Sequence, residues 1–189
     1  MSILKAHRKK IYPWIKASIA EDDTDDSTLQ LDGDESPIIL NWLGDLVITY
    51  VADMGDNFQM ILHGDLTTKM SIEDLHELAI ENLSRDVEFT LHETKFGGHG
   101  LIAGGDHEAG SICLPGMWEW LAEHLGDHLI VGIPSKDMVV MTPESDTEKI
   151  EGLKDLVREV FEGGERLLTK NIFRYDKDTR EWSIIDAVG

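Results

Sequence analysis

A chain of 189 residues, 41% of them apolar, can bury a core without disulfides, because a domain of this size removes about 70% of its unfolded surface from water. Its 17 basic and 37 acidic residues give a formal net charge of −20, and nucleic acid is a poor partner for such a chain because phosphate binding depends on Lys and Arg. No apolar run approaches the roughly 18 residues of a membrane span, and a single cysteine, Cys113, excludes an intrachain disulfide and favours a reducing compartment, the cytoplasm.

The first 20 residues differ in charge from the rest of the chain. They hold five basic side chains and no acidic one, which leaves 12 basic and 37 acidic residues, a charge of −25, for the remainder. Ile11, Trp14, Ile15 and Ile19 recur at helical spacing, so residues 6–20 are predicted to form a short basic amphipathic helix. Such a helix can lie on a membrane or pack on its own domain beside the acidic linker predicted at residues 21–28; we prefer packing.

Strand and turn signals follow. Residues 45–52 are β-branched and aromatic, which predicts a strand, and Gly55 is the expected positive-φ residue of the turn that leads to a return strand at 58–63. So short a connection requires an antiparallel hairpin. The capping-box pattern of Ser71 and Asp74 then predicts a helix start. Short strands are expected at 87–91 and 101–103.

The C-terminal half repeats this alternation of helices and hairpins. Helical spacing runs from Met117 to Leu125 and should stop at Gly126. A hairpin, a long helix and a final hairpin are predicted at 129–141, 146–162 and 172–185. Because strands come as hairpins with helices between them, we expect an α+β fold: a single domain over residues 29–189 with a mostly antiparallel sheet and about four helices, preceded by residues 1–20 as a basic helix or arm.

Several stretches of the sequence resemble one known family. They are residues 36–40, 79–83, 106–109, 133–140, and the hairpin of 173–175 with Trp182. On these stretches the chain resembles the YtpQ-like family of uncharacterised bacterial proteins over residues 29–185. The resemblance implies one compact domain, and it carries no activity, catalytic residue or cofactor.

Residues with possible catalytic chemistry gather in one glycine-rich stretch. His99 and His107 flank it, with Asp106 and Glu108 alongside, and this cluster is the candidate for a small hydrolase. The spacing of a zinc site or an EF-hand calcium loop is absent, so no metal and no cofactor are predicted.

Other catalytic patterns in the sequence are incomplete. Gly98 to Ala103 spells G-x-G-x-x-A but lacks the helix start that a dinucleotide site needs. Ser111 lacks the flanking glycines of a nucleophile elbow. Cys113 lies between two apolar residues, where burial raises the pKa of a thiol. These patterns do not decide whether the chain is an enzyme. We favour a non-catalytic role.

Two tryptophans point to a binding role instead. Trp118 and Trp120 stand two apart on a predicted helix, so both cannot face the same core. An outward tryptophan suits a protein interface. The leading hypothesis is a non-catalytic acidic module, inhibitor-like or immunity-like, that binds a basic protein through these tryptophans. The alternatives are the hydrolase and a peripheral membrane protein anchored by residues 6–20; the oligomeric state is left open.

Overall fold

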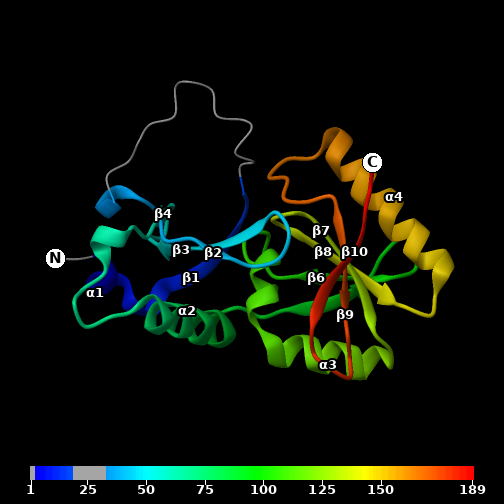
Figure 1. Cartoon of the computed structure of the whole chain (residues 1–189), viewed down its shortest axis with the longest axis horizontal. Helices are drawn as coiled ribbons and strands as arrows, with labels where there is room; N and C mark the ends of the chain where they lie inside the picture. The colour runs from blue at the N-terminus through cyan, green and yellow to red at the C-terminus, as the bar shows by residue number, and fades with distance from the viewer. Residues whose placement is uncertain (1–2, 19–32) are drawn as a thin grey trace. The chain divides into compact units, whose positions relative to one another are not determined.

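A computed structural model describes residues 3–18 and 33–189 (Figure 1). The chain divides into two compact units, residues 1–87 and 88–189, and each is described by itself. Within the described ranges there are four α-helices and ten strands in two sheets, and every strand ladder is antiparallel. The predicted α+β class is confirmed. The predicted acidic linker at 21–28 lies outside the described residues. The domain predicted over residues 29–189 is divided between the two units.

The first unit is built around one central strand. Strand β3 is buried along most of its length. It pairs with β1 on one edge and with β2 on the other, and its C-terminal residues also pair with β4. Helix α2 packs on β1. The elements are α1 (Ile3–His7), the 3-10 helix η1 (Arg8–Lys10), β1 (Ile11–Ala17), η3 (Gly33–Glu35), β2 (Leu40–Asn41), β3 (Leu46–Asp53), β4 (Phe58–Met60), η4 (His63–Asp65) and α2 (Ile72–Asp86).

The amphipathic helix predicted over residues 6–20 is wrong, because residues 11–17 form strand β1. Ile11 and Ile15 are four apart and share a face in a strand as well as in a helix, so their spacing cannot distinguish the two. Pairing with β3, from Ile11 opposite Ala52 to Ala17 opposite Leu46, decides the matter. Residues predicted as an arm therefore belong to the first sheet, and β1 tolerates Pro13 because it lies at the sheet edge.

Helix α2 begins where the sequence predicts. The Ser71 hydroxyl accepts the Asp74 backbone N–H at 3.1 Å, and the Asp74 carboxylate accepts the Ser71 N–H at 2.9 Å. These two bonds satisfy donors that the first helical turn leaves without partners. The helix then buries Leu75, Ala79 and Leu83 against the first sheet.

The second unit holds a six-stranded sheet in the order β10-β9-β7-β8-β6-β5. Helices α3 and α4 lie on opposite sides of it (Figure 1). The predicted hairpins at β7–β8 and β9–β10 are confirmed. The elements are β5 (Thr90–Glu93), β6 (His99–Ile102), η5 (Ala109–Cys113), α3 (Pro115–Leu125), β7 (Leu129–Ser135), β8 (Met138–Pro143), α4 (Thr147–Gly163), β9 (Asn171–Tyr175) and β10 (Trp182–Ala187).

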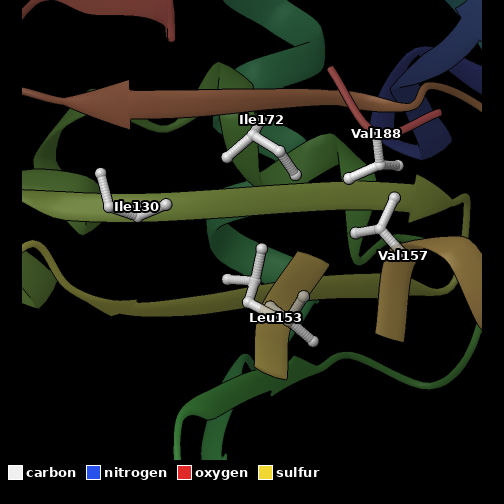
Figure 2. Close-up of a cluster of buried hydrophobic side chains, with 6 residues drawn as sticks. Ile130, Leu153, Val157, Ile172 and Val188 are labelled. Atoms are coloured by element: carbon white, nitrogen blue, oxygen red, sulfur yellow. The ribbon is translucent and has the colours of Figure 1, made fainter. Parts of the chain in front are cut away.

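Helix α4 covers one face of this sheet very closely. Buried residues from α4, from three strands and from the segment after β10 form an apolar cluster, shown in Figure 2: Ile130, Val140, Leu153, Val157, Ile172 and Val188. Gly132 on β7 faces the helix, and a Cβ there would lie 2.9 Å from the Val157 Cγ2. The missing side chain therefore sets the approach of α4 to β7.

Candidate interaction surface

The two neighbouring tryptophans of α3 have opposite environments. Trp118 is fully buried; its Nε1 donates to the Ser111 carbonyl at 2.8 Å, and its ring meets the Trp182 ring edge-on at 4.6 Å. Trp120 is 54% exposed. The prediction that the pair cannot share a face is confirmed. The prediction that Trp118 binds a partner is wrong, because its indole is buried in the core.

Trp120 belongs to an outward strip of α3 that we call the Trp120 surface: Gly116, Glu119, Trp120, Glu123 and His124. The imidazole of His124, one turn along, stacks on the indole with centroids 4.8 Å apart and planes 9° apart. One turn in the other direction, the position of a Cβ on Gly116 has no atom within 4 Å. The indole is thus supported on its C-terminal side and open on its N-terminal side.

Glu123 contributes a negative charge beside Trp120, while the charge of Glu119 is balanced by a cation. Glu119 pairs with Arg180 of the β9–β10 turn, and among the described residues the exposed Glu123 forms no ion pair. An aromatic face next to a carboxylate attracts a Lys or Arg side chain by cation–π and Coulomb terms. The Trp120 surface therefore suits a cationic group on a partner.

The two carboxylates of the hydrolase hypothesis have other partners in the structure. Glu108 is 2% exposed, and its Oε1 accepts the backbone N–H groups of Ala103 and Gly105 at 2.8 and 2.7 Å. Asp106 pairs with Arg166 Nη2 at 2.8 Å. Both carboxylates thereby hold the 103–106 loop.

The histidines of that hypothesis come from two different elements. His99 lies on β6 opposite Met141 of β8, while His107 lies in the turn before η5. Glu108 Oε1 and Asp106 Oδ1 bind backbone N–H groups and Arg166, respectively, which gives both carboxylates a structural role in the loop. Arg166, the residue that engages Asp106, was missed by the sequence reasoning because it lies 60 residues away.

The two candidate nucleophiles are buried in η5. Ser111 is fully buried, and burial raises the pKa of the Cys113 thiol to about 12. Because the thiolate is the reactive form, Cys113 is a core residue rather than a nucleophile.

One grouping of metal-ligand residues was not predicted. Atoms of His128, Asp176 and Asp178 lie within 4.8 Å of one another. However, His128 Nδ1 accepts the Lys177 N–H at 3.0 Å, so the lone pair of Nδ1 is occupied. Asp176 Oδ1 accepts two backbone N–H groups at 2.9 Å each, and Oδ2 binds Arg174 Nη1 at 2.6 Å. The bonds to Asp176 hold its pKa well below its usual range, and the bond from Lys177 to His128 ties the β9–β10 turn to the residue before β7.

No helix in the described ranges is long and apolar enough to cross a membrane. Comparisons with known proteins add no relative: no family model, no curated protein and no solved structure matches this chain.

Proposed function

We propose that this chain is a non-catalytic binding protein that holds a basic protein partner on the Trp120 surface. The observation that carries the proposal is the large exposed indole of Trp120, stacked on His124 and close in the helix to the exposed carboxylate of Glu123. An aromatic side chain held in this way offers contact area with little loss of rotamer entropy on binding.

The charge of the whole chain supports a basic partner. A net charge of −20 attracts cationic proteins and raises their association rate at low salt. At physiological ionic strength the screening length is about 8 Å, so charge alone gives modest affinity. The remaining affinity must come from burial of the Trp120 indole against the partner. A tryptophan at the centre of an interface contributes roughly 2 kcal/mol or more to the binding free energy.

The two alternatives have less support. The hydrolase cluster has both of its carboxylates engaged in holding a loop. The membrane anchor depended on a helix at 6–20, but residues 6–17 form the end of α1, then η1 and β1, and residues 19–20 lie outside the described residues. Membership of the YtpQ-like family, which we retain as a proposal, adds no activity. A single cysteine favours the cytoplasm as the place of action.

The test begins with a partner captured from the native host and identified by mass spectrometry, and it is decided by kinetics with that partner purified. Trp120→Ala should raise the dissociation rate about 30-fold, the equivalent of roughly 2 kcal/mol. The matched control is Ile102→Ala, which truncates another half-exposed apolar side chain in the same unit and should leave dissociation unchanged. Raising salt from low to physiological concentration should slow association.

The proposal is wrong if the partner is acidic or a nucleic acid. It is equally wrong if salt leaves the association rate unchanged and Trp120→Ala leaves the dissociation rate unchanged. The same holds if Ile102→Ala raises the dissociation rate as much as Trp120→Ala does.

A further inference from the structure

The first unit carries a basic cluster that the proposed function does not use. Arg8, Lys9 and Lys10 form the 3-10 turn η1 and are all exposed. Lys5 of α1 and Arg85 near the end of α2 complete the set, which we call the basic cluster. It is unusual in a chain with 37 acidic residues and only 17 basic ones.

The backbone of the basic cluster is held in place from below by α2. The buried Asn82 donates from Nδ2 to the carbonyls of Arg8 and Ile11 at 2.9 and 3.0 Å. Arg85 Nη2 donates to the Lys9 carbonyl at 2.8 Å. These three bonds tie the carbonyls of the turn to α2 and leave its cationic side chains in solvent. A ligand would therefore meet a turn whose backbone is already ordered, which lowers the entropic cost of binding.

Carboxylates offset part of the positive charge of this cluster, since Arg8 lines a hollow of about 340 Å³ with Asp74, Glu77 and Glu81 of α2. Lys10 Nζ lies 4.0 Å from Asp53, and Arg85 pairs with Asp86 at 2.6 Å. Within residues 3–18 and 33–189, Lys5, Arg8 and Lys9 form no ion pair. Neighbouring like charges repel one another, and a bound anion would remove that repulsion.

Two further hollows adjoin the turn and share part of their lining. One, of about 610 Å³, is lined by Lys5, His7, Arg8 and Met54 together with Lys9, Lys10 and Asp53. The other, of about 510 Å³, shares those last three residues and adds Tyr12, Arg85 and Asp86. Both hollows are open to solvent, so a ligand there would be held by the charged side chains that line them.

We infer that the basic cluster binds a small polyanion that carries several phosphate groups. Lys and Arg side chains give phosphate oxygens charge-assisted hydrogen bonds, the strong class of such bonds. A small ligand is favoured over a nucleic acid or an anionic membrane because those extend well past the cluster. Beyond about 8 Å, the screening length, they would face the acidic remainder of the surface and gain nothing from the cluster.

The test uses inorganic tripolyphosphate as the probe and isothermal titration calorimetry of the full chain as the readout. Arg8→Ala with Lys9→Ala should weaken binding by about 10-fold to 100-fold, since each lost charge-assisted bond is worth about tenfold. The matched control is Lys16→Ala with Lys95→Ala, which makes the same charge change at exposed positions outside both hollows and should alter affinity less than about twofold. Backbone amide shifts on titration should be concentrated in residues 5–11.

Three results would overturn this inference. One is an equal loss of tripolyphosphate affinity in the two double variants, which would show that only the net charge of the chain matters. Another is the absence of tripolyphosphate binding at low salt. The third is duplex DNA or anionic lipid vesicles binding more tightly than tripolyphosphate and losing affinity with Arg8→Ala and Lys9→Ala, which would assign the cluster to a macromolecule.

Discussion

Glu108 shows how the surroundings of a side chain decide its role. In the sequence it stands beside His107 in a glycine-rich stretch, which is compatible with acid–base chemistry. In the fold its Oε1 accepts two backbone N–H groups from the loop before it. An acceptor that holds two loop donors stabilises the loop conformation, and this is the contribution that we assign to Glu108.

Cys113 gives a prediction at the scale of a single residue. With its pKa raised to about 12 by burial, the thiol at pH 8 is ionised in only about one molecule in 10,000. We expect no measurable reaction of the native chain with an aromatic disulfide reagent over an hour, and full reaction in guanidinium chloride. Rapid stoichiometric labelling of the native chain, with its circular dichroism unchanged, would contradict this.

Asp176 predicts a pH dependence of stability. Its pKa is depressed by the backbone N–H of Thr179 and by Arg174, and so lies below the ordinary value of 3.8. A depressed carboxyl pKa contributes stability above the unfolded-state pKa and loses it as the pH falls toward the folded-state value. Asp176→Asn should therefore lower the urea midpoint at pH 7 and reduce its change between pH 7 and about pH 2.

The control for that prediction is Asp178→Asn. The Asp178 side chain is 82% exposed and lies two residues away, so the same charge is removed from the same turn with little effect expected. Equal pH profiles for Asp176→Asn and the unmodified chain would show that the carboxylate bonds are not formed in solution.

At the scale of elements, the packing of α4 on β7 depends on the absence of a side chain. Gly132→Ala would place its Cβ 2.9 Å from Val157 Cγ2 and 3.2 Å from Leu153 Cδ2. Valine is stiff about χ1 and both neighbours are buried, so the helix or the strand must shift. We expect a loss of about 1–3 kcal/mol in the free energy of unfolding, measured by urea denaturation.

Gly116→Ala on α3 is the matched control for Gly132→Ala. A Cβ there meets no atom within 4 Å, and alanine favours helix over glycine, so stability should stay the same or rise by up to about 1 kcal/mol. Equal effects of the two substitutions would mean that α4 does not pack on β7 as described.

At the scale of the whole chain, a net charge of −20 opposes compactness through self-repulsion. Raising NaCl from about 10 mM to about 150 mM shortens the screening length from about 30 Å to about 8 Å. The melting temperature should rise by roughly 2–4 °C for each kcal/mol of repulsion removed. KCl at equal ionic strength should give the same rise, and a fall in melting temperature would show that ion pairs dominate the electrostatics.

The sequence alone predicted those elements whose signals are local. The capping box of Ser71 and Asp74 starts α2, and Gly55 and Gly126 take the positive φ that ends a strand and a helix. Alternation and turn residues predicted the hairpins of β3–β4, β7–β8 and β9–β10. Such signals act between residues a few positions apart, so they survive without knowledge of the rest of the chain.

Only the tertiary structure decided the features that join distant residues. Residues 11–17 are a strand because β3, which pairs with them from Ile11 opposite Ala52 to Ala17 opposite Leu46, supplies their hydrogen bonds, whereas their own spacing fits both helix and strand. The cation at Arg166 that engages Asp106 and the Asn82 amide that holds the Arg8 carbonyl are likewise distant in sequence. Spacing required that Trp118 and Trp120 face different ways, but the position of β10, with Trp182 against Trp118, determined which indole is buried.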